Sequence, residues 1–207
     1  MKSRVLYSVS TARLRQLAVF LFIVLLAGCA RALHPGGGGA PPPVVPIVFP
    51  LAADSVRFTS GFGDDRPGGR KHAGQDIFCP RWTPILAVVD GTVDWILTEH
   101  PKPGKGYRVL LRGDDGNLYY YDHLNDDDPG TRDNRGTPRY AYARGLKNGI
   151  RVAAGDILGY VGDSGNAEQA GPHLHFEIHI TKWENPIDPA PSLREALQRR
   201  SGGGGKK

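Results

Sequence analysis

The sequence predicts an all-β fold: an antiparallel sandwich or barrel-like single domain with one short helix at its C-terminal end. Short stretches alternate apolar and polar residues, most regularly in His173–Ile180. Glycine- and aspartate-rich turns separate these stretches, and no long segment shows the apolar period of a helix. Closely spaced strands of this kind pair antiparallel, and 207 residues are enough for one domain with appendages.

The first 28 residues predict a secretory signal. Basic residues precede an apolar run from Leu17 to Ala27, whose 11 residues are too few for a comfortable bilayer span. The run ends in Leu26-Ala27-Gly28-Cys29, which resembles the lipobox of bacterial lipoproteins. This resemblance implies cleavage before Cys29, lipid attachment to its sulfur, and an exported protein anchored to the bacterial cell envelope, in the outer membrane or periplasm of a two-membrane cell. Ordinary signal-peptidase cleavage nearby is the alternative, because the neighbouring residues are also small.

The charge of the chain depends strongly on this signal. The formal net charge is +5, with 26 basic and 21 acidic residues. Four of the basic residues and none of the acidic ones precede Cys29, so the remaining chain carries a net charge of only +1. The basic character is therefore no argument for nucleic-acid binding, and we expect no nucleic-acid partner.

A flexible tether is predicted for residues 29–51, because glycine and proline dominate much of this stretch. The folded domain is then expected to span residues 52–191. Asp90-Gly91 and the glycine–aspartate cluster at residues 113–117 would each turn one strand back on the next as a hairpin. The expected strands are residues 56–59, 85–89, 92–97, 107–111, 118–124, 157–161 and 173–180.

The end of the chain and two other features carry further expectations. Ser192-Leu193-Arg194-Glu195 fits a capping box, so residues 192–207 are expected to form a short helix and a disordered tail. Residues 125–148 are a long connection, which is either functional or a solvated excursion, and our hypothesis is that it overhangs a binding groove. Its acidic run Asp126–Asp128 would bind a cation or face solvent. Cys79 is expected to be buried as a small apolar residue, with a metal ligand or reactive thiol as alternatives.

Histidines in a strand pattern provide the first candidate metal ligands. His173 and His175 share one face of the predicted strand, together with Glu177 and His179. Each step of two residues moves about 6.6 Å along a strand. Glu177 and His179 are therefore expected to line the groove or face solvent rather than bind a metal.

Two further patterns add an imidazole each. His72 and Asp76 provide a nitrogen and a carboxylate, which are good zinc ligands, and nearby glycines let the backbone turn so that they converge. His123 ends a strand with several tyrosines, and simple alternation places it on the face of Tyr119 and Tyr121. Each pattern alone is weak evidence for a metal site.

The surrounding motifs make the combination specific. The motifs SGFG (60–63), HAGQDI (72–77), TPILAVVDGTV (83–93), YDHL (121–124), GDILGYVGDSGNA (155–167) and GPHLHFEI (171–178) resemble the LytM/lysostaphin-like zinc metallopeptidases. The resemblance implies a fold of the duplicated-hybrid-motif type and an endopeptidase that acts on peptidoglycan peptides. It also implies one zinc ion held by His72, Asp76 and His175, with His123 and His173 as further active-site residues.

The implied coordination suggests a hydrolytic mechanism. Three protein ligands leave one position open, as in catalytic rather than structural zinc sites. One of His123 and His173 would move the proton, and the other would stabilise the oxyanion. The sequence leaves open which histidine does which, which peptide bond is cleaved, and the oligomeric state.

Two other functions compete with this interpretation. A non-catalytic peptidoglycan-binding lipoprotein could activate another wall hydrolase, although all five implied site residues are present. A biotinyl or lipoyl carrier is suggested by residues 87–93 and 152–158, but these segments lack the lysine at a hairpin tip that a carrier needs.

Overall fold

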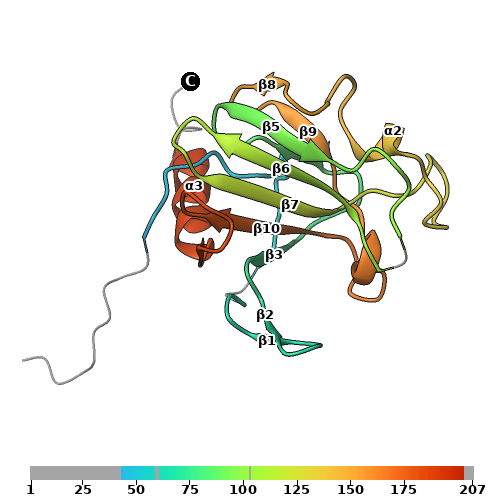
Figure 1. Cartoon of the computed structure of the whole chain (residues 1–207), viewed down its shortest axis with the longest axis horizontal. Helices are drawn as coiled ribbons and strands as arrows, with labels where there is room; N and C mark the ends of the chain where they lie inside the picture. The colour runs from blue at the N-terminus through green and yellow to red at the C-terminus, as the bar shows by residue number, and fades with distance from the viewer. Residues whose placement is uncertain (1–42, 59–60, 103, 203–207) are drawn as a thin grey trace, which may run out of the picture. The chain divides into compact units, whose positions relative to one another are not determined.

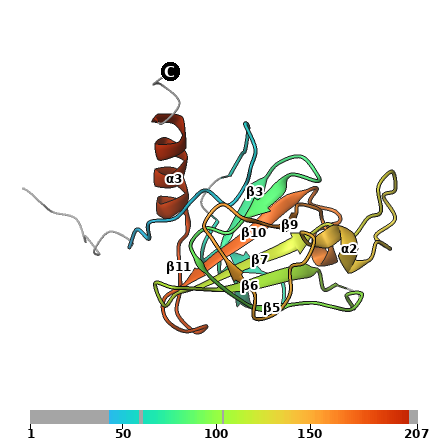
Figure 2. The same cartoon turned by 90° about the horizontal axis from the view of Figure 1, so that it is seen from above.

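Most strands belong to one seven-stranded sheet (Figure 1). The computed structural model describes residues 43–58, 61–102 and 104–202. The strands lie in the order β11-β10-β7-β6-β5-β8, and β3 pairs with β10 on the edge that β11 also uses. Figure 2 shows β3, β10, β7, β6 and β5 side by side. Their bounds are β3 Gln75–Phe78, β5 Gly91–Ile96, β6 Tyr107–Gly113, β7 Leu118–Leu124, β8 Arg151–Val152, β10 His173–His179 and β11 Pro186–Ile187.

Two short antiparallel pairs and a few helices complete the described fold. In one pair β1 (Asp65–Arg66) lies beside β2 (Arg70–Lys71), and in the other β4 (Pro84–Leu86) lies beside β9 (Ile157–Tyr160). The helices are a single turn α2 (Pro138–Ala141), a 3₁₀ turn η1 (Gly165–Ala167) and the C-terminal α3 (Ala190–Gly202). The predicted all-β class with a short C-terminal helix is confirmed, and the described strands do not close into a barrel.

The core lies between one face of the main sheet and the β4–β9 pair. β10 contributes Leu174, Phe176 and Ile178, which are all fully buried, as its alternation predicts. From the other side come Ile85 and Leu158, and all five belong to one hydrophobic cluster. Burying this row leaves the opposite face of β10, with its histidines, available for a site.

The structure corrects the first predicted hairpin. Asp90-Gly91 does separate β4 from β5, but β4 pairs with β9, whereas β5 pairs with β6 and β8. The turn therefore carries the chain from one layer to the other. The second predicted hairpin is confirmed, because β6 and β7 pair across residues 113–118. Residues 56–58 form only a bridge, between Arg57 and Phe78.

The predicted tether is wrong for residues 43–51. Val45, Ile47, Phe49 and Leu51 are buried and belong to the core. The segment runs antiparallel to β4, with hydrogen bonds from Val48 N to Val88 O (2.8 Å), Leu86 N to Pro50 O (2.8 Å) and Ala52 N to Pro84 O (3.0 Å). Alternate residues of an extended segment face the same side, so this run places its apolar row inward despite its prolines. The folded domain therefore includes residues 43–51.

The C-terminal helix begins two residues before the predicted cap. Ser192 lies inside α3, and its Oγ accepts a hydrogen bond from the backbone N–H of Val45 (2.9 Å). Asp188 Oδ1 accepts from the N–H of Ala190 (2.9 Å) and so satisfies a donor at the helix start. Beyond it, Arg199 donates to Ile47 O and Arg200 donates to Leu51 O, which fastens α3 to the N-terminal segment (Figure 1).

The long connection of residues 125–148 contains α2 and is held by buried polar contacts. Arg81 donates to Asp127 Oδ2 (2.7 Å) and to Asp163 Oδ1 (2.6 Å), and Asp127 is fully buried. The carboxylates of Asp126, Asp127 and Asp163 lie within 4.8 Å of one another. Arg81 thus supplies a positive charge to the acidic run, in which Asp126 and Asp127 are buried and only Asp128 faces solvent.

Several predictions fall outside the described residues. They are the signal segment 1–28, Cys29 and its lipid, the tether up to residue 42, and the tail 203–207. Within the described ranges, no helix has both the length and the apolar character that crossing a membrane requires.

Candidate metal centre

The register of the main sheet brings two of the predicted ligands together. His175 on β10 lies directly opposite Asp76 on β3. His72 follows β2, and the chain returns through Gly74 into β3. A Cβ at Gly74 would lie 2.4 Å from Phe176 O and 2.8 Å from Glu177 Cγ, so only glycine permits this close approach.

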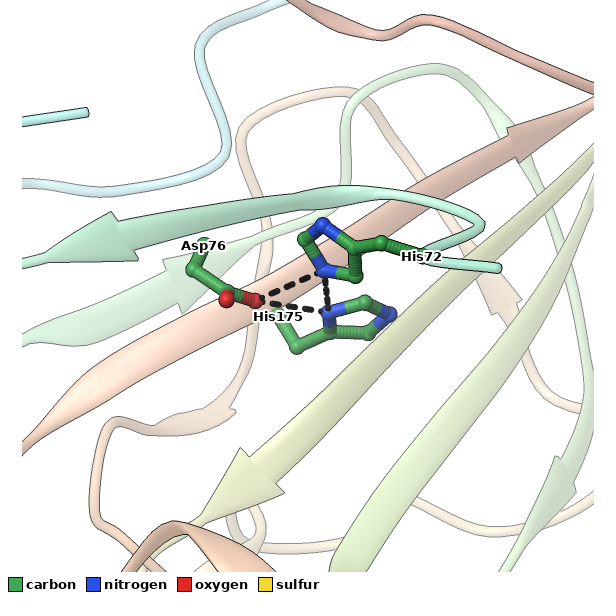
Figure 3. A group of neighbouring side chains, drawn as sticks. All are labelled: His72, Asp76 and His175. Atoms are coloured by element: carbon green, nitrogen blue, oxygen red, sulfur yellow. Dashed lines mark hydrogen bonds and ion pairs between the residues drawn. The ribbon is translucent and has the colours of Figure 1, made fainter. Parts of the chain in front are cut away.

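The three side chains form a tight triangle of ligand atoms (Figure 3). His72 Nε2 lies 3.1 Å from Asp76 Oδ1 and 3.1 Å from His175 Nδ1. His175 Nδ1 lies 2.8 Å from the same Asp76 oxygen. Zinc with bonds of about 2.0–2.2 Å needs tetrahedral ligand atoms roughly 3.3–3.5 Å apart, which a small opening of this triangle provides.

The outer nitrogens of the two imidazoles indicate which atoms face the centre. His72 Nδ1 lies 2.8 Å from Gly61 O, and His175 Nε2 lies 2.8 Å from Glu177 Oε1. Both outer partners are acceptors, so these nitrogens carry the protons in the neutral rings. Two nitrogen lone pairs and one carboxylate oxygen then converge without a donor between them. This donor set fits a cation.

The pKa values of Asp76 and His175 indicate that the three side chains favour a positive charge between them. Burial would raise the pKa of Asp76, but hydrogen bonds with His175 and His72 hold it far below its usual range. Burial would lower the pKa of His175, but Asp76 and Glu177 raise it to about 9. A proton or a metal ion can satisfy this demand, and a metal would replace the proton on His175 Nδ1.

The two other predicted histidines lie beside the triad. His173 Nε2 is 3.9 Å from Asp76 Oδ1, and the ring centres of His123 and His173 are 4.8 Å apart. His173 Nδ1 donates to Gly171 O (2.8 Å) and His123 Nδ1 donates to Ser164 O (2.9 Å), which leaves both Nε2 atoms as acceptors. Burial lowers the pKa of His123, although Asp122 acts in the opposite direction. A neutral imidazole is thereby favoured at this position.

The side on which His123 lies differs from the prediction by alternation. Tyr119 and Tyr121 are fully buried in the core, whereas His123 lines the groove together with Asp122. His123 has a φ of 63°, which interrupts the strand geometry at the end of β7. Only the resemblance to a known family placed this residue in the site.

Comparison with known proteins decides the family. The model of peptidase family M23 matches residues 70–189, which is more than half of the chain. The chain belongs to peptidase family M23. Within this family, the resemblance to LytM/lysostaphin-like endopeptidases is confirmed by the relatives and solved structures that match.

Three similar proteins illustrate the range of the family. An L-Ala–D-Glu endopeptidase of Bacillus subtilis (strain 168) is 31% identical over 157 residues, which cover 70% of this chain and 42% of the relative. The glycyl-glycine endopeptidase ALE-1 of Staphylococcus capitis is 30% identical over 131 residues, 62% of this chain and 30% of the relative. The catalytic domain of the antimicrobial peptidase lysostaphin from Staphylococcus simulans superposes with a TM-score of 0.51 at 27% identity, over 67% of this chain and 92% of that domain. The chain thus spans less than half the length of these two curated relatives.

The site of this M23 domain opens into a groove of about 970 Å³. Its floor comes from β7 and β10, with Tyr120, Asp122 and His175 among the lining residues. The β1–β2 hairpin and the segment before β6 supply further lining side chains. None of residues 125–148 lines the groove, so the structure does not support the hypothesis that this loop overhangs it.

Two carboxyl-side neighbours of His175 have a role that the sequence did not reveal. Glu177 lines the groove, which was one of the two predicted positions, and is 7% exposed, whereas His179 is 2% exposed and does not line it. Burial would raise the pKa of Glu177, but hydrogen bonds with His175 and His179 lower it to about 2. Glu177 Oε2 lies 2.5 Å from His179 Nε2, and His179 stacks on Trp183 at 4.2 Å between ring centres. Glu177 therefore fixes the orientation of His175 without being positioned as a ligand.

Ser164 and Gly106 also contribute in ways that the sequence missed. Ser164 is fully buried, and its Oγ accepts from the N–H of Tyr107 (3.0 Å) while its carbonyl holds His123. A Cβ at Gly106 would lie 2.7 Å from that hydroxyl. The GDSGN motif thus positions a histidine, and no signal in the sequence alone indicated this contact.

Cys79 belongs to neither of the two groups of side chains that could hold a metal ion among the described residues. It is partly buried and packs against the hydrophobic core. Burial raises its pKa to about 11, against a hydrogen bond with Thr83 that lowers it. The thiol stays protonated, which agrees with the expectation of an inert residue.

Proposed function

We propose that the protein is a zinc-dependent endopeptidase that hydrolyses peptide bonds in peptidoglycan. The observation that carries the proposal is the convergence of three metal-ligand atoms beside two imidazoles whose Nε2 atoms are free to accept a proton. M23 peptidases are zinc-dependent, and the named relatives are endopeptidases. The family is established, and what we propose is the activity and the substrate of this chain.

The residues divide into two groups by their expected roles. His72, Asp76 and His175 would hold one zinc ion, which when bound would supply a Lewis acid for the scissile carbonyl and lower the pKa of a water. His123 and His173 both line the groove, and their ring centres are 4.8 Å apart. One of them would take the proton from the attacking water at Nε2 and return it to the leaving amine, and the other would stabilise the oxyanion as an imidazolium that donates from a protonated Nε2.

Digestion of purified peptidoglycan tests this proposal. We expect new peptide termini by mass spectrometry and about one zinc per chain by elemental analysis. The variant His175→Ala should lose both zinc and cleavage. The matched control His100→Ala should retain both, because His100 is exposed and lies outside the groove.

Two more variants separate metal binding from proton transfer. His123→Ala and His173→Ala should keep the zinc but lose roughly 10²–10⁴-fold in turnover, the usual contribution of a general acid or base. A wild-type protein without zinc and without cleavage products would instead favour the non-catalytic, regulatory alternative.

We also propose that the protein is exported and anchored to the cell envelope by a lipid on Cys29. The proposal is supported by the basic, apolar and lipobox-like order of the first 29 residues. Metabolic labelling with a fatty acid should mark the wild type, and Cys29→Ser should abolish the label. A labelled Cys29→Ser protein would contradict this assignment.

A further inference from the structure

The groove around the metal site is lined by more basic than acidic side chains. Three acidic residues line it, and each already has hydrogen-bond partners within the protein. Asp76 faces the two histidines, Glu177 lies between His175 and His179, and Asp122 accepts from the N–H of His123 (2.8 Å) and the hydroxyl of Tyr120 (2.9 Å). The basic lining residues are Arg66, Arg70, Lys71, Lys105 and Arg108.

Some of these basic residues remain available to a ligand. Lys71 is paired with Asp65 (2.7 Å), and Arg108 donates to the hydroxyl of Tyr120 (2.8 Å). Arg70 and Lys105 are exposed and form no ion pair with any residue that the structure describes. They come from different elements, β2 and the segment before β6. Two separate positive charges therefore remain uncompensated along the groove.

Arg66 offers a donor directly beside the triad. Its Nη2 donates to Asp76 Oδ2 (2.8 Å), the oxygen that does not face the two imidazoles. Its Nε is buried and has no hydrogen-bond partner among the described residues. This Nε is out of reach of a ligand, but the Arg66 side chain is 38% exposed, and a carboxylate is a strong acceptor for the exposed part of its guanidinium.

We infer that the groove selects peptides that carry free carboxylates, with Arg70 and Lys105 attracting them and Arg66 as the donor nearest the metal site. The inference rests on the proposed peptidase function. It places the substrate of this chain among acidic stem peptides rather than neutral glycine bridges, a distinction on which the names of the two curated relatives differ.

Three peptides test the inference on the full-length, zinc-loaded protein. They are an acidic cross-linked stem peptide, the same peptide with its carboxyl groups amidated, and pentaglycine. We expect kcat/KM for the acidic peptide to exceed the amidated one by about tenfold, mainly through KM, because each exposed charge pair contributes modestly. The difference should shrink at high salt, which screens exposed charges.

A charge-reversal variant assigns the effect to named residues. Arg70→Glu combined with Lys105→Glu should raise KM for the acidic peptide about tenfold and leave kcat nearly unchanged. The matched control, Arg144→Glu with Lys147→Glu, changes two exposed basic residues outside the groove and should leave KM unchanged. Equal kcat/KM for the acidic and amidated peptides would overturn the inference.

Binding measurements keep the two proposals separable. Absence of cleavage of every peptide would contradict the proposed function, and calorimetric titration of the uncleaved peptides would then decide the inference. Tighter binding of the acidic peptide, lost in the Arg70→Glu, Lys105→Glu variant, supports charge selection. Equal affinity for the acidic and amidated peptides contradicts it.

Discussion

The four histidines of the site are oriented by different kinds of partner. His72, His123 and His173 each donate from Nδ1 to a backbone carbonyl, which no side-chain substitution removes. His175 instead depends on the carboxylate of Glu177. The orientation of the predicted metal ligand His175 thus depends on one side chain, so it is the histidine most sensitive to a substitution at a neighbouring residue.

Glu177→Gln should lower zinc affinity roughly tenfold or more, because a carboxylate that accepts from a ligating histidine strengthens the ligand. Competition with a chromogenic chelator measures this change. Glu184→Gln is the matched control, since Glu184 is exposed and does not line the groove. Equal zinc affinity in wild type and Glu177→Gln would show that Glu177 does not support His175.

Asp126 should make the stability of the fold depend on pH. It is 5% exposed, its Oδ1 has no hydrogen-bond partner among the described residues, and burial together with Asp127 raises its pKa to about 7. An unfolded aspartate titrates near pH 3.9. Its stabilising proton is therefore fully present below about pH 4 and is lost as the pH rises through about 7.

Removing this charge should stabilise the protein at high pH. We expect Asp126→Asn to raise the free energy of unfolding by about 1–2 kcal/mol at pH 8, after discounting for partial solvent screening, and to have little effect near pH 4. Urea titrations at both pH values measure the difference. Asp128→Asn, at an exposed position, should show no such trend, and a trend of equal size there would refute the explanation.

At the scale of elements, the N-terminal segment and α3 form one packed unit with β4. Phe49 is 2% exposed, and Arg200 lies 5.1 Å above its ring. The composition of the segment suggested a tether, whereas the structure buries Val45, Ile47 and Phe49. The composition misled because proline is compatible with an extended edge segment as well as with a flexible one.

Phe49→Ala should cost about 3–5 kcal/mol of stability, the range for truncating a buried phenylalanine. Val48→Ala at the neighbouring position should cost less than about 0.5 kcal/mol, because Val48 is 41% exposed and faces outward. Denaturant unfolding of the two variants gives the comparison. Similar small losses for both would mean that this segment is not part of the core.

The elements show where sequence patterns predict this fold well and where they fail. Alternation in β10 correctly placed Leu174 and Phe176 in the core and His173 and His175 on the other face. It failed at His123, because a positive φ ends the alternation there. It also could not show that Glu177 is buried between two histidines, where Gly74, the residue before β3, closely approaches it. Tertiary contacts of this kind leave no periodic signal.

At the scale of the whole molecule, the metal site and the core occupy opposite faces of the main sheet. The ligand atoms belong to β3, β10 and the turn between β2 and β3, while the core residues face the β4–β9 pair. We therefore expect the core to fold without the metal. The metal should instead add stability in proportion to its binding.

Removal of zinc with a chelator should abolish peptide hydrolysis and leave the far-ultraviolet circular dichroism unchanged. At a zinc concentration of about 1,000 times Kd, readdition should raise the free energy of unfolding by about 4 kcal/mol. Thermal unfolding with and without zinc measures this gain. Loss of the β spectrum in the metal-free protein would show that the fold itself depends on the metal.

The packing of residues 43–51 has a mechanical consequence. The hydrogen bonds of Val48, Pro50 and Ala52 with the chain around β4 lie in register along one extended segment. A pull on the chain before residue 43, directed along this segment, would load these bonds together in shear rather than peel them apart one at a time. If the chain is held at Cys29 and its groove holds the cell wall, as we propose, tension between the two would meet this joint before it reached the strands that carry the histidines.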